Sequence, residues 1–112
     1  MNILVVIIDR SGGRINSLRD LATFLKNNVK LSTYRVREKS GLPFGIGDKE
    51  YTTKPAALYS GCKVVLKRFF DLTDSEAEDA MKLLYDAGFI WYEPYETWIE
   101  GRGPDKLVIF NI

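Results

Sequence analysis

The chain has 112 residues, a formal net charge of +1, no histidine and one cysteine. The lack of histidine excludes Ser-His-Asp triads and histidine-ligated metal sites, and a lone cysteine excludes an internal disulfide and a multi-cysteine zinc site. A nearly neutral chain has no overall field that attracts polyanions, so a nucleic-acid role would require a local basic patch. The length predicts a single domain, residues 1–112, with a modest core.

The apolar segments are too short for a membrane span, which needs about 20 apolar residues. The first apolar run ends at Asp9 and has no basic region before it, so we do not expect a signal peptide. The sequence therefore predicts a cytoplasmic protein without a membrane partner. No pattern predicts a cofactor or a bound metal, because the acidic residues that follow Thr73 lack the spacing of a calcium loop.

The first half of the chain predicts a strand, a helix and a second strand. The run Ile3 to Ile8 is apolar throughout and short, which is typical of a strand buried on both faces. A glycine turn follows, and Ser17 with Asp20 forms a capping pattern for a helix that ends near Asn28. Leu31 to Lys39 alternates like a strand.

The middle of the chain is predicted to pass from an irregular segment into a central strand. Residues 40–60 are rich in glycine and proline, and Lys54 to Tyr59 is expected to form a short helical turn with Pro55 at its first position. Lys63 to Phe70 is rich in β-branched and aromatic residues, which favours a strand. Cys62, at the start of this strand, is expected to be a buried small hydrophobe rather than a reactive thiol.

The last third predicts one helix and three strands. Thr73 and Glu76 have the spacing of a capping box, an apolar stripe follows at helical spacing, and Gly88 suits the position just past the helix end. Strands are expected over Phe89 to Tyr92, Tyr95 to Glu100 and Leu107 to Ile112. The last two would pair as a hairpin.

This order of elements predicts an α+β fold. Two strand–helix–strand units side by side give a ferredoxin-like βαββαβ sandwich, here with an extra C-terminal β-hairpin. Both helices would lie on one face of a four-stranded antiparallel sheet, which leaves a helix-free face on the other side.

The glycine turn is a candidate anion-binding site. Backbone N–H groups of Ser11, Gly12 and Gly13 at the start of a helix could hold a phosphate, and Arg14 could clamp it. The pattern is neither a P-loop nor a dinucleotide-binding fingerprint, and an ordinary tight turn is the alternative. An acidic residue that ends a first strand, as Asp9 would, resembles the small metal-dependent nucleases of the ferredoxin-like class that serve CRISPR adaptation. That resemblance implies a nuclease that uses Asp9.

Basic and aromatic residues on the helix-free face form a second candidate site. We expect the following side chains to share that face and to bind single-stranded nucleic acid by tracking phosphates and stacking a base: Arg35, Arg37, Lys63, Lys67 and Phe69. The sequence motif of the RNA-recognition fold is absent, and an ordinary solvated strand face is the alternative.

Aromatic residues beside that face form a third candidate site, a partner interface. Its members are Phe44, Trp91, Tyr92, Tyr95 and Trp98. A small satellite core under the C-terminal hairpin is the alternative.

These patterns favour a small non-enzymatic protein-interaction or regulatory module, such as an accessory protein of a virus. It would self-associate as a homodimer or dock on a protein partner through the helix-free face and the aromatic C-terminal segment. Single-stranded nucleic-acid binding is the alternative, and a metal-dependent nuclease-like activity at Asp9 is a weaker one.

Overall fold

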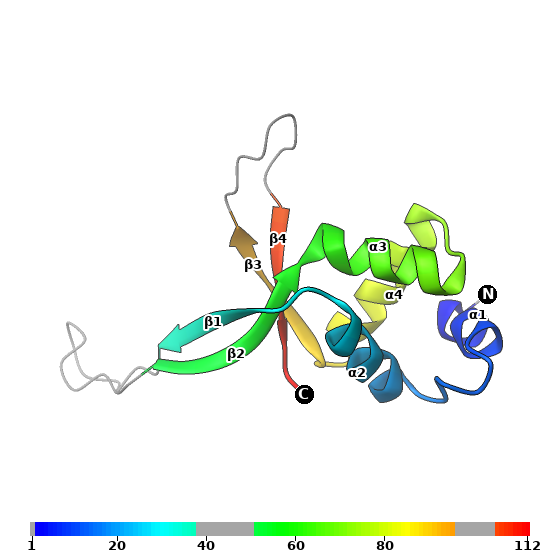
Figure 1. Ribbon diagram of the computed structural model, residues 1–112, viewed down its shortest axis with the longest axis horizontal. Coiled ribbons are helices and arrows are strands. Elements are labelled where there is room, and N and C mark those ends of the chain that lie inside the picture. Colours follow the sequence, from blue (N-terminus) through cyan, green and yellow to red (C-terminus); the bar gives the residue numbers. More distant parts are fainter. Residues whose placement is uncertain (1, 38–50, 96–104) are drawn as a thin grey trace.

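The computed structural model describes residues 2–37, 51–95 and 105–112 (Figure 1). The helices in these ranges are α1 (Ile3–Arg10), α2 (Leu18–Asn28), α3 (Tyr59–Phe70) and α4 (Asp74–Asp86). The strands are β1 (Ser32–Arg37), β2 (Tyr51–Leu58), β3 (Ile90–Tyr95) and β4 (Asp105–Phe110). None of these helices has both the length and the apolar character needed to cross a membrane.

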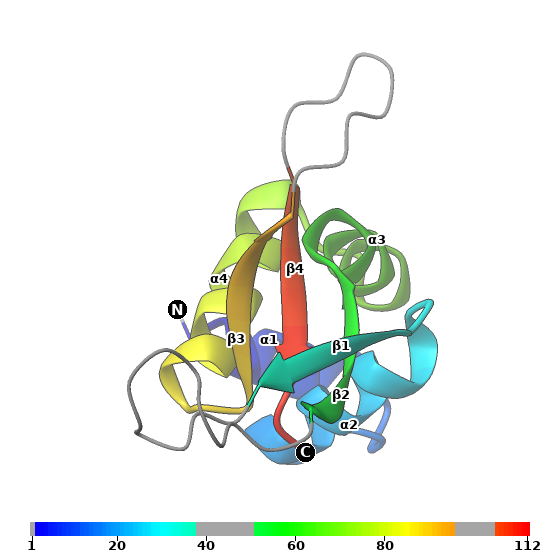
Figure 2. The same cartoon turned by 90° about the vertical axis from the view of Figure 1, so that its left-hand side faces the viewer.

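The described strands form one antiparallel sheet in the order β1-β2-β4-β3. The helices lie on one side of this sheet in Figure 1, and Figure 2 shows the opposite side, where no described helix covers the strands. The predicted α+β class with helices on one face is confirmed. The ferredoxin-like topology is not confirmed, because the strand order differs and the helices occur in consecutive pairs.

The prediction of a central strand over Ile3 to Ile8 is wrong, since this run is helix α1. Asn2 caps the helix by accepting a hydrogen bond from the backbone N–H of Leu4 at 2.9 Å. The run buries Ile3 and Ile7, which are four residues apart and therefore on one helical face. Burial of this stripe outweighs the strand preference of the β-branched residues.

The prediction of a strand over Lys63 to Phe70 is also wrong, because this segment belongs to helix α3. Its buried side chains are Cys62, Leu66 and Phe70, a stripe at intervals of four residues. The helix ends at Asp71, which takes a left-handed conformation with φ of 51°. Asp is among the few non-glycine residues that tolerate this conformation.

Two further boundaries differ from expectation in the segments around the helices. Lys54 to Tyr59 does not form a helical turn, since residues up to Leu58 belong to β2. The predicted pairing of Tyr95 to Glu100 with the last strand is wrong, since β4 pairs along its length with β3 (Ile90–Tyr95). Most of the expected strand lies outside the described residues.

The caps predicted for α2 and α4 are confirmed. The Ser17 hydroxyl accepts from the N–H of Asp20 at 3.1 Å. In α4 the Thr73 hydroxyl accepts from the N–H of Glu76 at 3.2 Å, and the Glu76 carboxylate accepts from the N–H of Thr73 at 2.9 Å. At the other end of α4, Gly88 takes φ of 81° and its N–H donates to Tyr85 O.

The main core lies between the helices and the sheet. Leu66 of α3 and Met81 of α4 pack in one cluster with Val108 and Phe110 of β4, and each is at most 1% exposed. A smaller cluster occupies the helix-free face, where its members are Ala56, Leu107 and Ile109, with Tyr34 and Trp91 packed against them. We call this group the sheet-face cluster.

The capping box at the start of α4 yields a stability prediction. Thr73→Ala removes the side-chain acceptor for one helix N–H and should lower the free energy of unfolding by about 1 kcal/mol, measured by urea denaturation. Ser75→Ala, at an exposed position in the same helical turn, serves as the control and should cause no comparable loss. Equal midpoints for the two variants would contradict the prediction.

Candidate functional site

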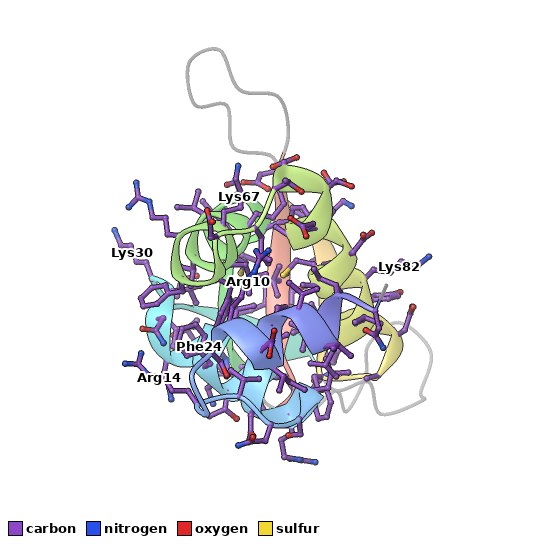
Figure 3. All side chains as sticks on the ribbon, turned by 90° about the vertical axis from the view of Figure 1, so that its right-hand side faces the viewer. Arg10, Arg14, Phe24, Lys30, Lys67 and Lys82 are labelled. Carbon is purple, nitrogen blue, oxygen red and sulfur yellow. The ribbon has the colours of Figure 1, made fainter. Side chains whose placement is uncertain are left out.

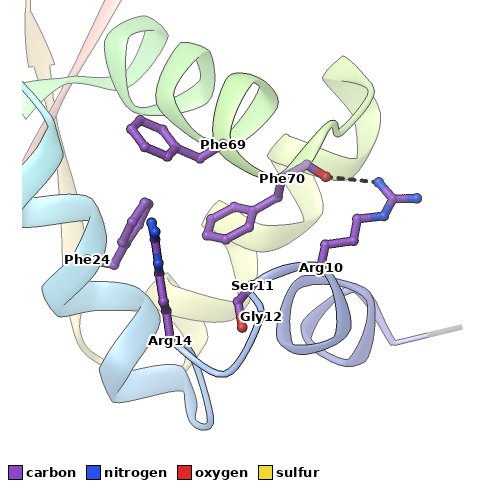
Figure 4. Close-up of a pocket in the computed structure, with 7 residues that line it drawn as sticks. All are labelled: Arg10, Ser11, Gly12, Arg14, Phe24, Phe69 and Phe70. Atoms are coloured by element: carbon purple, nitrogen blue, oxygen red, sulfur yellow. Dashed lines mark hydrogen bonds between the residues drawn. The ribbon is translucent and has the colours of Figure 1, made fainter.

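A pocket of about 340 Å³ opens between the loop that follows α1 and the C-terminal end of α3 (Figure 4). Its volume lies near the lower end of the range for small-molecule sites, roughly 300–1,000 Å³. The lining residues come from α1, its loop, α2 and α3: Arg10, Ser11, Gly12, Arg14, Phe24, Phe69 and Phe70. The pocket therefore combines positive charge, a glycine turn and aromatic rings.

Ser11 holds the turn that forms the floor of the pocket. Its hydroxyl donates to Ile8 O at 2.8 Å and accepts from the N–H of Ile15 at 3.1 Å. Ser11 is also buried, so its hydroxyl serves the turn instead of facing a ligand. Anion binding by the turn from Ser11 to Arg14 stays a prediction, and within that set the Ser11 side chain is structural.

Gly12 and Gly13 leave the backbone of the turn open to solvent. Both take positive φ, 64° and 90°, a conformation that side chains disfavour. Ser11 precedes them in the right-handed helical region, and this sequence of conformations gathers successive N–H groups into a concavity that suits an anion. Within the described residues, the N–H groups of Gly12 and Gly13 form no backbone hydrogen bond, and no atom lies within 4 Å of where a Cβ would stand.

The aromatic wall of the pocket comes from α2 and the last turn of α3. The ring of Phe69 is 51% exposed and meets Phe24 edge to face, with centroids 5.1 Å apart and an interplanar angle of 82°. Phe70 supports Phe24 from the core side, also at 5.1 Å. Phe69 directly precedes Phe70, the last buried residue of α3, so the helix positions its backbone while half of its side chain stays accessible.

The arginines of the pocket have different roles. Arg10 Nη1 donates to Phe70 O at 3.0 Å and to Asp71 O at 2.7 Å, so it caps the C-terminal carbonyls of α3 and ties this helix to α1. Arg14 is exposed, and Figure 4 shows its side chain extending along Phe24. Arg10 therefore joins the walls of the pocket, whereas Arg14 is available to a ligand.

Lysines on the other side of α3 are engaged with acidic residues of α4. Lys63 Nζ lies 3.0 Å from Asp74 Oδ1 and 3.2 Å from Glu78 Oε1, and Lys67 Nζ lies 3.3 Å from Asp74 Oδ1. Hydrogen bonds from Lys63 and Lys67 hold the pKa of Asp74 below its usual range. Lys67 remains half-exposed, and Figure 3 shows it on the same side of the molecule as Arg10 and Phe24.

The predicted nucleic-acid set does not share one face of the sheet. Lys63, Lys67 and Phe69 are in α3, while the backbones of Arg35 and Arg37 are in β1. The folded chain instead brings Phe69 to the glycine turn and Arg14, which had been assigned to a separate site. Members of two predicted sites thus meet in one pocket.

The predicted partner interface is also divided. Trp91 packs on the sheet-face cluster, whereas Tyr92 points to the helices, stacks on Tyr85 at 4.8 Å and donates to Met81 O at 3.2 Å. Alternation along β3 explains the split. Phe44 and Trp98 lie outside the described residues, and for Tyr95 only the backbone is described.

The remaining candidates for a chemical role are Asp9, Cys62 and possible metal ligands, and the structure gives the position of each. Asp9 is exposed near the end of helix α1, so the strand-end position on which the nuclease resemblance depended is absent. Cys62 is buried as predicted, and burial raises the pKa of its thiol to about 12, so the thiol is protonated at neutral pH. Over the described ranges, no group of three or more His, Cys, Asp or Glu side chains could hold a metal ion.

Sequence reasoning missed the contributions of Arg10, Phe24 and Phe70 to the pocket. Phe24 was recognisable as part of the apolar stripe of α2, but nothing local indicates which aromatic ring it meets. Its contacts with Phe69 and Phe70 join positions more than forty residues apart in the chain, and these depend on α3 being helical.

Comparisons with protein-family models, with curated proteins and with solved structures found no match.

The role of Arg10 yields a prediction that separates it from Arg14. Arg10→Ala removes hydrogen bonds to the end of α3 and should lower the free energy of unfolding by about 0.5–1.5 kcal/mol in urea denaturation. Arg14→Ala removes an exposed charge and should change it by no more than about 0.5 kcal/mol. Equal effects of the two substitutions would contradict the division of roles.

Proposed function

We propose that the chain is a non-enzymatic nucleic-acid-binding module that holds an unpaired nucleotide of a single strand in the pocket between α3 and the Ser11–Arg14 turn. The observation that carries the proposal is that an exposed aromatic ring, Phe69, lines the same pocket as an open glycine turn and an accessible arginine. A base and a phosphate need these features close together.

The base would stack on Phe69. A half-exposed ring offers one face to a base, and its edge contact with Phe24 fixes its orientation before binding. Stacking of a base on an aromatic side chain contributes about 1–3 kcal/mol and tolerates any sequence, because every base has a π face. This part of the proposal predicts weak sequence preference.

The phosphate would lie against the turn. The N–H groups of Gly12 and Gly13 are exposed, and Arg14 can add a charge-assisted hydrogen bond from the side. The backbone of a strand could continue past the pocket, because further basic residues lie on the same side of the molecule, including Lys30 and Lys67 (Figure 3). Because the net charge of the whole chain is only +1, nucleic-acid binding requires a local basic patch of this kind.

A different mode, binding of duplex DNA, is disfavoured by charge. The elements β2, α3, α4 and the β3–β4 hairpin, with β4 between β2 and β3, have the order of a winged helix-turn-helix domain. Such domains place the N-terminal residues of the second helix in the major groove. In α4 these include Asp74, Glu78 and Asp79, and even with Asp74 and Glu78 paired to lysines of α3 they offer no positive charge to the phosphates. The pocket is therefore preferred to α4 as the contact.

A second candidate function is docking of a protein partner on the helix-free face. The specific observation that favours it is the sheet-face cluster, in which the half-buried rings of Tyr34 and Trp91 cover apolar residues and no described helix lies above them. Aromatic side chains of this kind are enriched in interfaces.

Fluorescence anisotropy with a labelled mixed-sequence single-stranded oligonucleotide tests the main proposal. Phe69→Ala should weaken binding roughly tenfold or more, because the stacking surface is lost. Arg14→Ala should weaken binding and reduce the slope of log affinity against log salt by about 0.7, the value for one phosphate contact on a single strand.

The matched controls are Tyr85→Ala, which removes an exposed aromatic ring from α4, and Arg19→Ala, which removes a positive charge from the far side of α2 beside Phe89. Both variants should bind as the native chain does. No binding at low salt, or equal losses in the controls and the pocket variants, would refute the proposal. Tighter binding of duplex than of single strand would move the contact to α4.

A further inference from the structure

The helix-free face of the sheet has an apolar centre that contains one polar group without a hydrogen-bond partner among the described residues. In the cross-strand register, Ala56 of β2, Ile109 of β4 and Trp91 of β3 form one row, and the first two are fully buried. The Trp91 Nε1–H is also buried and has no hydrogen-bond partner in the described part of the chain. Buried donors of this kind nearly always have an acceptor in native assemblies.

Residues of opposite charge stand on either side of this row. Lys54 of β2 is two residues from Ala56, and its Nζ lies 4.5 Å from the centre of the Trp91 ring and donates to Asn111 Oδ1 at 2.9 Å. Glu93 of β3 is two residues from Trp91 and pairs in register with Leu107, a member of the sheet-face cluster. Because side chains alternate along a strand, Lys54 and Glu93 point to the same face.

This arrangement is self-complementary. Consider a two-fold axis in the plane of the interface. If the axis passes midway between Lys54 and Glu93, perpendicular to the line that joins them, it brings each Lys54 to the Glu93 of a second copy. The same operation brings the two sheet-face clusters together, and the partly exposed rings of Tyr34 and Trp91 would make the apolar contact, since Ala56 and Ile109 are already buried within one chain. An isologous interface requires this reciprocal pairing, in which residue i meets residue j and j meets i.

We infer that the helix-free face is the interface of a symmetric homodimer, in which Lys54 of each copy pairs with Glu93 of the other across the sheet-face cluster. A second copy fits better than a partner of one charge, since the described side chains of this face include Lys54 and Glu93, which are of opposite sign, beside the sheet-face cluster. The inference does not depend on nucleic-acid binding. The dimer would leave both pockets accessible, because the pocket is on the helical side of the molecule and the interface on the other (Figures 1 and 2).

Sedimentation equilibrium over a concentration series from the micromolar to the millimolar range tests this inference. The native chain should pass from monomer to dimer without larger species. Lys54→Glu and Glu93→Lys should each weaken dimerisation by about tenfold or more, because each reversal places like charges together at both symmetric pairs. The double variant with both changes restores opposite charges and should dimerise within a few-fold of the native chain.

A native chain that stays monomeric throughout the series would overturn the inference, as would a double variant no better than either single variant. If a charge reversal prevents folding, as judged by far-UV circular dichroism, the neutral pair Lys54→Gln and Glu93→Gln replaces it. Each neutral variant should then weaken dimerisation relative to the native chain, and unchanged dimerisation in both would overturn the inference. Lys82→Glu, a substitution in α4 away from the sheet, is the control. If it weakens dimerisation as much as the Lys54 and Glu93 variants do, the inference is also contradicted.

Discussion

Burial of one stripe of α3 is the constraint on which the rest of the structure depends. Cys62, Leu66 and Phe70 face the core between the helices and the sheet, and this orientation determines where every other side chain of the helix points. On one side it directs Lys63 and Lys67 to the acidic start of α4, and on the other it places Phe69 against Phe24. If this segment were extended, its lysines and Phe69 would share a sheet face, and the pocket would not exist.

The pocket is a composite of segments that are distant in the chain and are held together by few interactions. Arg10 links the end of α1 to the end of α3, and Ser11 fixes the turn that follows, so the accessible groups, Arg14 and Phe69, are carried by a supported frame. Arg10 and Ser11 therefore support the structure of the pocket, while the exposed Arg14 and Phe69 are the groups that a ligand can contact. This separation is what makes substitution of Arg14 informative about binding rather than about folding.

The sheet divides the molecule into sides with different chemistry. The helical side carries basic residues, an exposed aromatic ring and an open turn, while the helix-free side carries an apolar row between Lys54 and Glu93. A dimer formed through the second side would present pockets from both copies at once. Simultaneous contact of both pockets with one strand would raise the apparent affinity through effective concentration, without any new contact in either pocket.

The sequence by itself determined the local features whose signals are strong and short in range. The caps at Ser17 and Thr73, the glycine at position 88 and the strand after Leu31 were all predictable, because each depends on neighbouring residues and on backbone preferences. The exposed glycine turn was predictable for the same reason. Tertiary structure alone decided the state of Ile3–Ile8 and of the segment from Lys63 to Phe70. Their β-branched residues favour strands, yet their apolar positions also match a helical stripe, and only the surface available for burial selects between the two periods. The meeting of Phe69 with Arg14 follows from that selection, and so it could not be derived from either segment alone.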